Sequence, residues 1–226
     1  IVAPQVSPTS SPIPSSVSPS PSPSVTASPN NDDVCFSASS LIRVMGKGVV
    51  QLLDVQVGDK VQSFDEEHHG LEYSEVILVQ HEHSDAKHKI LVIDYSSQTT
   101  GQSGTLRVTP RHYVYMSTGA NQMVHIRAQD LQVGDELIMG FKTKARITSI
   151  GEGMDQVRNI HTMNDRAVID GVFVSCFAAN PVWGGSLDVP FLKALILPFK
   201  YLYRMELVWM IKVLDGLVHK AHKYIQ

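Results

Sequence analysis

The chain has 226 residues, of which 43% are hydrophobic, and 19 lysines and arginines stand against 22 aspartates and glutamates. This is enough apolar material for the core of one domain with appendages. The near balance of charge argues against a dedicated nucleic-acid-binding protein, which carries a basic patch or stripe. Two cysteines exclude a disulfide-rich mini-protein and a four-cysteine zinc site, and no stretch of about 18 uncharged apolar residues predicts a membrane-spanning helix.

Residues 1–34 form a segment of low complexity. They contain 8 of the 12 prolines, 10 serines, and only two charged side chains, Asp32 and Asp33. Such a segment has too little apolar surface to offset the entropy of ordering it. It is therefore predicted to be an extended, disordered linker with polyproline-II character, acting as a spacer rather than as a recognition ligand.

Residues 35–181 have the sequence pattern of an all-β domain. Short runs rich in β-branched and aromatic residues alternate with glycine, aspartate and asparagine, at a spacing of roughly 8–12 residues that is typical of a sandwich or barrel-like fold. We expect strands at 40–44, 49–53, 76–79, 89–93, 106–108, 113–115, 146–150, 168–169 and 172–174.

An internal repeat supports this fold class. The octapeptide that begins at Asp54 (DVQVGDKV) recurs 76 residues later at Asp130 (DLQVGDEL). In each copy the Val-Gly-Asp sequence predicts a tight turn in which glycine takes a backbone conformation that other residues resist. The repeat therefore indicates a duplicated β-subdomain with a pseudo-two-fold axis.

Residues 187–226 carry six basic and three acidic side chains and are predicted to be helical. We expect one helical run over 191–203, broken at Pro198, and a longer run over 203–222. The longer run has a broad apolar face made by Leu207, Met210, Ile211, Leu214, Leu217 and Val218. Two interpretations stay open: a helix packed on its own domain or on a partner, and an amphipathic helix at a membrane surface, which the positive charge and Trp209 favour.

Cys35 lies at the junction between the linker and the β domain. From sequence alone the cysteine pair Cys35 and Cys176 could be a bridge, a catalytic thiol with a partner, or two core residues. A thiol at the first folded position can attack the carbonyl of Val34, an N-to-S acyl shift that converts a peptide bond into a thioester. Conversion of an amide into a thioester is unfavourable in free energy. The reaction therefore requires a polarised carbonyl and an acid that protonates the leaving nitrogen.

Thr109 and His112 can supply part of this help. They lie three residues apart around Pro110, at the end of a predicted strand. Thr109 can hydrogen-bond the scissile backbone, and His112 can protonate the departing nitrogen. A lone histidine is more often structural than catalytic. A Thr-x-x-His pattern together with a cysteine at the start of a domain is, however, uncommon.

Five sequence blocks together resemble the autoprocessing domain of hedgehog proteins, within the wider Hint (hedgehog/intein) class. They are the segment beginning Cys35-Phe36, the Val-Gly-Asp block, and the segments 73–77 (YSEVI), 108–112 (VTPRH) and 174–178 (VSCFA). The resemblance covers about residues 34–180. It implies an all-β horseshoe with pseudo-two-fold symmetry and self-cleavage of the Val34–Cys35 bond, with Cys35 as nucleophile. It also implies assistance by Thr109 and His112, with Cys176 as a second thiol that can pair with the nucleophile.

Three departures from the hedgehog pattern modify this expectation. Val34 stands where hedgehog precursors have glycine, and its branched side chain should slow thioester formation and release. His81 stands where the family has the aspartate that activates the sterol hydroxyl, so the acceptor is left open among water, a sterol and another alcohol. The histidine-asparagine dipeptide that inteins use for splicing is missing, since Asn180 precedes Pro181; we therefore expect cleavage without splicing.

The remaining expectations concern partners, metals and location. The substrate is the chain's own upstream segment, a sterol or other lipid is a candidate acceptor, and we expect no cofactor, no metal and no nucleic acid. Similarity to hedgehog-like secreted proteins places the chain in the secretory pathway, extracellularly or at the cell surface. Two rivals remain: a slow or inactive Hint scaffold that serves as a secreted binding module, and a structural zinc site among the histidines 68, 69, 81, 83 and 88.

Overall fold

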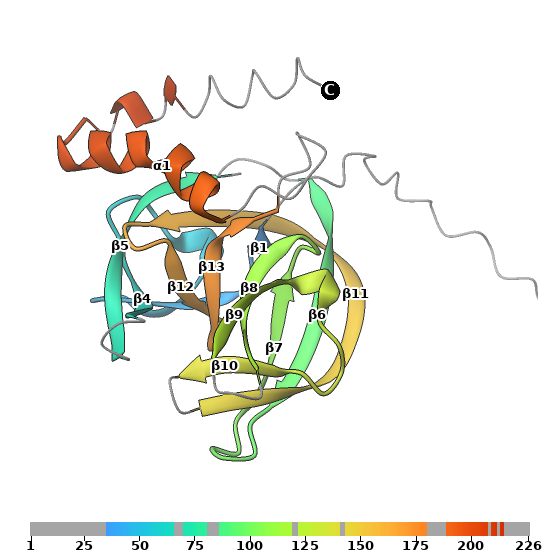
Figure 1. Cartoon of the computed structure of the whole chain (residues 1–226). Helices are drawn as coiled ribbons and strands as arrows, with labels where there is room; N and C mark the ends of the chain where they lie inside the picture. Colours follow the sequence, from blue (N-terminus) through green and yellow to red (C-terminus); the bar gives the residue numbers. More distant parts are fainter. Residues whose placement is uncertain are drawn as a thin grey trace, which may run out of the picture.

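The structure, a computed structural model, describes residues 35–65, 70–80, 86–118, 122–140, 143–179, 189–207, 209–211 and 213–214. The chain folds into a curved, highly twisted β-structure with one helix laid across its edge (Figure 1). Its elements are β1 (Phe36–Ser37), β2 (Leu41–Val44), β3 (Gly48–Gln51), η1 (Leu52–Asp54), β4 (Lys60–Asp65), β5 (Gly70–Gln80), β6 (Lys87–Ser96), β7 (Ser103–Val108), β8 (His112–Ser117), β9 (Met123–Arg127), η2 (Ala128–Asp130), β10 (Glu136–Gly140), β11 (Thr143–Thr162), β12 (Arg166–Ile169), β13 (Val172–Ala178) and α1 (Val189–Arg204).

The all-β class is confirmed, and all nine predicted runs overlap strands. Two details were wrong. Leu52 and Leu53 belong to the 3₁₀ turn η1 and not to a strand, and the run 146–150 is only part of the 20-residue strand β11. β11 escaped prediction as one strand because its middle, from Ser149 to Gln156, carries polar and glycine residues that look like a loop. The extra strand length is stabilised by pairing, since β11 is hydrogen-bonded to β6 from Arg146 to Gln156.

The repeated octapeptides form the same local structure twice. In each half a hairpin (β2–β3 or β8–β9) is followed by a 3₁₀ turn, the Val-Gly-Asp turn and a second hairpin (β4–β5 or β10–β11). Gly58 and Gly134 both have positive φ, 96° and 101°. The following aspartates, Asp59 and Asp135, each accept a hydrogen bond from the backbone N–H three residues earlier. Similar sequence, strand pairing and turn chemistry in the two halves support the duplication.

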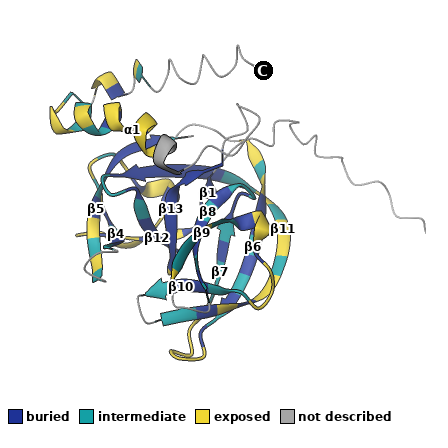
Figure 2. Cartoon of the chain, in the orientation of Figure 1, coloured by how far each residue is buried: buried dark blue, intermediate teal, exposed yellow. Residues whose placement is uncertain are grey.

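The core lies where the two halves face each other. Burial is most continuous along β13, whose seven residues are all buried, and Figure 2 shows this strand as a dark band at the centre of the molecule. Alternating burial on β2, where Ile42 and Val44 are buried and their neighbours exposed, follows from the two-residue period of a strand. Segments close to the centre therefore contact both halves. The candidate residues lie on these central segments.

The C-terminal helix packs on its own domain. Ile196 and Phe199 of α1 lie in one cluster with Ile77 and Leu78 of β5 and Phe177 of β13. The expected break at Pro198 was wrong, because α1 runs through this residue. Pro198 is itself exposed, and the burial of its neighbours Ile196 and Phe199 offsets the hydrogen bond that proline cannot donate.

The outer face of the same helix is exposed and apolar, with Leu195, Leu197 and Tyr201 at the surface. Among the described residues, no helix has the length and apolar character needed to cross a bilayer. The linker 1–34 and the predicted helical residues Leu217 and Val218 lie outside the described residues.

Candidate active site

Cys35 and Thr109 are joined by two hydrogen bonds. β1 begins immediately after Cys35 and lies between β7 and β11, since Phe36 pairs with both Val108 and Arg158. The Cys35 N–H donates to the Thr109 Oγ1 at 2.8 Å, and the Thr109 N–H donates to the Cys35 carbonyl at 2.8 Å. Both residues are buried. The nitrogen of the Val34–Cys35 peptide bond is therefore held against a hydroxyl group away from solvent.

The Thr-Pro-Arg-His segment forms a tight turn between β7 and β8. The His112 N–H donates to the Thr109 carbonyl at 3.2 Å, and Pro110 and Arg111 accept hydrogen bonds from Gln129 of η2 and from Ala179 after β13. The turn is thus fixed from two sides. The sequence spacing of three residues places Thr109 and His112 at the two ends of this turn.

His112 has a defined protonation pattern at one ring nitrogen. Its imidazole is completely buried, lies 4.1 Å from the ring of Phe36 (centroid to centroid), and places Nε2 2.8 Å from the carbonyl oxygen of Ser175. A carbonyl can only accept, so Nε2 carries a hydrogen in the neutral as well as in the charged ring. Nδ1 is therefore the nitrogen that carries a hydrogen only in the charged ring.

Cys176 is a buried thiol, and it does not form a disulfide with Cys35 in this structure. Its Sγ lies 3.5 Å from the Thr162 hydroxyl, and burial raises the pKa of the thiol to about 12. Only the thiolate is a strong nucleophile. Cys176 therefore stays protonated near neutral pH.

Several predicted residues fall on segments that the structure leaves undescribed. Val34 and His81 lie outside the described residues, as do three of the other histidines weighed for zinc, at 68, 69 and 83. Within the described ranges no group of three or more histidine, cysteine or carboxylate side chains could hold a metal ion. The structure thus brings Cys35, Thr109, His112 and Cys176 to the same region and leaves the position of His81 a prediction.

The sequence reasoning missed a polar cluster beside these residues. Asn159 and His161, both buried on β11, hydrogen-bond Gln80 at the end of β5, with donor–acceptor distances of 3.2 and 3.3 Å. The Asn159 amide also donates to the Cys176 carbonyl at 3.4 Å. Asn159 and His161 are two residues apart on a strand that leads toward Cys176, so the strand period was the signal that could have placed them on one face.

His161 is held neutral. Burial lowers the pKa of this imidazole to about 3, and the nearby positive charges of His112 and Lys200 act in the same direction. An unfolded histidine titrates near about 6.5. Between these two values the unfolded chain binds a proton that the folded chain does not, so the free energy of unfolding falls as the pH falls.

A His161→Gln substitution should flatten this pH dependence. Glutamine retains hydrogen-bonding capacity toward Gln80 and Asn159 but does not titrate. In the unsubstituted chain, His161 should lower the free energy of unfolding by about 2 kcal/mol between pH 7 and pH 5. The measurement is urea unfolding at both pH values. An equal loss in the two proteins would show that His161 is not held neutral.

An ion pair connects α1 to the turn that follows β11. Lys200 Nζ lies 2.6 Å from a carboxylate oxygen of Asp165, and both side chains are largely buried. The backbone carbonyl of Asp165 accepts the N–H of Cys176 at 3.0 Å. The helix therefore places a positive charge beside the strands that carry His161 and Cys176.

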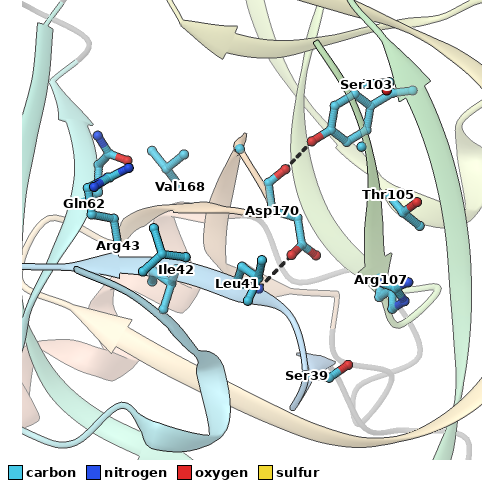
Figure 3. A pocket seen from close by; sticks show the side chains of 14 residues that line it. Ser39, Leu41, Ile42, Arg43, Gln62, Ser103, Thr105, Arg107, Val168 and Asp170 are labelled. Carbon is cyan, nitrogen blue, oxygen red and sulfur yellow. Dashed lines mark hydrogen bonds between the residues drawn. The ribbon is translucent and has the colours of Figure 1, made fainter. Parts of the chain in front are cut away.

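A cavity of about 540 Å³ lies elsewhere, between β2 and β7 (Figure 3). At its centre Asp170 accepts a 2.7 Å hydrogen bond from the Leu41 N–H, and Tyr95 donates its hydroxyl to the Asp170 carbonyl. Burial raises the pKa of the Asp170 carboxyl, although the hydrogen bond from the Leu41 N–H acts in the opposite direction. Neither Cys35 nor His112 lines the cavity. The two hydrogen bonds of Asp170 join the β12–β13 turn to β2 and β6.

Comparison with known proteins identifies the family and the fold. The Hint module family model matches residues 21–181. Among solved structures, the M86 variant of the Ssp DnaB mini-intein is 16% identical with a TM-score of 0.50, covering 64% of this chain and 94% of that one. The G-1F mutant of this variant is 17% identical with a TM-score of 0.50, covering 63% of this chain and 98% of that one. A DnaB intein from Synechocystis sp. PCC 6803 is 20% identical with a TM-score of 0.49, again covering 63% of this chain and 98% of that one. A search of curated proteins finds no match. Because the family model spans well over half of the sequence, the chain belongs to the Hint module family.

Proposed function

We propose that the domain cleaves its own chain at the Val34–Cys35 bond by an N-to-S acyl shift. The observation that carries this proposal is the hydrogen bond from the Cys35 N–H to the Thr109 hydroxyl, because it fixes the nitrogen that must leave. The Hint fold supports autoprocessing in general, and the buried Cys35, Thr109 and His112 supply a nucleophile, an orienting hydroxyl and an acid.

In the proposed first step, the Cys35 thiolate attacks the carbonyl carbon of Val34. The S–C bond forms, the C–N bond breaks, and the nitrogen of Cys35 becomes an amine. The hydrogen bond to Thr109 holds the nitrogen in place, and as the C–N bond breaks, the lone pair of this nitrogen receives a proton from Nδ1 of His112. A positioned acid of this kind contributes on the order of 10²–10⁴-fold to a rate.

In the proposed second step, a nucleophile resolves the thioester and releases the upstream segment. Water, a sterol or another alcohol can fill this role, with His81 as the base that activates it. The exposed apolar face of α1, with Leu195, Leu197 and Tyr201, fits contact with a lipid or a membrane surface. The hedgehog-type subclass, a location in the secretory pathway, and cleavage without splicing are parts of the same proposal.

Mass spectrometry of the full chain tests the first step. Incubation with dithiothreitol or hydroxylamine should release residues 1–34 as a thioester-derived adduct, together with a fragment that begins at Cys35. Omission of the nucleophile is the control for chemical breakage. A chain that remains intact after days in hydroxylamine would contradict autoprocessing and favour a scaffold without activity.

A further inference from the structure

Asn159 occupies the point at which β11 changes partner. Val157 and Arg158 pair with Ser37 and Phe36 of β1, and from Asn159 onward β11 pairs with β5. Continued by one residue, the β1 register places Asn159 opposite Cys35. Directly opposed residues of antiparallel strands present their side chains on the same face.

The packing of Cys35 agrees with this placement. Cys35 shares a buried cluster with Val157 of β11 and Ile90 of β6. Asn159 follows Val157 by two residues, so it presents its side chain on the same face of β11. Asn159 is 4% exposed, so its polar side-chain atoms lie in the interior.

The orientation of the Asn159 amide follows from its partners. Its Nδ2 donates to the Cys176 carbonyl and to Gln80 Oε1, and the Cys176 carbonyl can only accept. Oδ1 must then point away from β5 and β13. This oxygen is buried and accepts no hydrogen bond from the part of the chain that the structure describes. A buried acceptor without a donor is costly, because it has lost its hydration without replacement.

The proposed acyl shift creates new donors at this place. Before the reaction the nitrogen of Cys35 carries one hydrogen, which Thr109 already accepts. After the shift the thiol proton and the broken C–N bond leave an amine, which takes a further proton near neutral pH. The amine therefore has two more N–H groups than the amide, and Thr109 alone does not satisfy them.

We propose that Asn159 Oδ1 is the acceptor for the amine that the acyl shift releases at Cys35, with Gln80 as the residue that positions its amide. The inference rests on the proposed self-cleavage. An acceptor that is unsatisfied in the amide form and satisfied in the thioester form shifts an uphill equilibrium toward the thioester. The arrangement thus adds a product-stabilising group to the nucleophile and the acid.

Thiol-driven cleavage of the full chain in dithiothreitol measures this contribution. Asn159→Ala should slow release of residues 1–34 by about 10- to 100-fold, which is the effect of one hydrogen bond to a charged group. Asn159→Asp keeps an acceptor oxygen and should cleave faster than Asn159→Ala. Gln80→Leu should give an intermediate loss, since the amide is then less firmly oriented.

Asn164→Ala is the matched control. Asn164 also hydrogen-bonds partners from two segments, Ser63 and Thr162, but lies in the turn after β11. Its loss should lower thermal stability without a comparable loss of cleavage. Cleavage of Asn159→Ala at the rate of the unsubstituted chain would overturn the inference. Failure of the unsubstituted chain to cleave would instead overturn the proposed function.

A second readout does not depend on the rate. In the cleaved product, NMR titration of the ¹⁵N-labelled Cys35 amine should give a higher pKa with Asn159 present than with Asn159→Ala, because Oδ1 binds the ammonium form. A merely structural asparagine would not change this value. Equal amine pKa values in the two folded products would exclude the assigned acceptor.

Discussion

Alanine in place of Cys35 should leave the full chain uncleaved, in dithiothreitol and in hydroxylamine alike. The methyl side chain of alanine has no nucleophilic atom and cannot accept the acyl group, so the expected effect is complete loss rather than a reduced rate. The substitution removes one small buried side chain next to Ile90 and Val157, so the fold should be retained. Mass spectrometry of the intact chain measures the outcome, with heat denaturation to verify folding.

Cys176→Ala is the control for this prediction. Cys176 is the only other thiol in the sequence, and burial raises its pKa to about 12, which removes it as a nucleophile near neutral pH. The variant should therefore release residues 1–34 in dithiothreitol. Release from Cys35→Ala, or its absence from Cys176→Ala in a folded protein, would mean that the nucleophile has been assigned to the wrong residue.

Local sequence patterns predicted most of the fold because the relevant interactions are local. The repeated Val-Gly-Asp turns were evident, since Gly58 and Gly134 require positive φ and each aspartate caps its own turn. The length of β11 was not evident, because its polar middle is stabilised only by pairing with β6, far along the chain. Continuity of α1 through Pro198 likewise depends on burial of Ile196 and Phe199 against β5 and β13.

In the candidate site, too, local features could be predicted and features that depend on distant strand pairing could not. Cys35, Thr109 and His112 stood out because a cysteine at a domain start and a Thr-x-x-His turn are sequence-local features. Asn159 and Gln80 did not, because neither has a distinctive neighbour, and they meet only through the β5–β11 register. Sequence spacing identified the groups that are proposed to break the bond, and strand pairing was needed to find the groups around them.

Substitution of His112 should have the second-largest effect. His112→Gln keeps a side-chain N–H that can donate to the Ser175 carbonyl, but it removes the titratable nitrogen Nδ1. Without a positioned acid, thiol-driven release of residues 1–34 should slow by about 10²–10⁴-fold. The measurement is the cleavage rate in dithiothreitol, with His125→Gln, an exposed histidine on β9, as the matched control.

The neighbouring imidazole should not rescue His112→Gln. His161 lies within electrostatic reach of His112, but its pKa of about 3 leaves it without a proton to donate near neutral pH. Two adjacent buried imidazoles therefore have separate roles, because burial and the charge of Lys200 keep His161 neutral while His112 remains the acid of the proposed step. Cleavage of His112→Gln at the unsubstituted rate would mean that solvent protonates the leaving nitrogen, which the burial of Cys35 and Thr109 argues against.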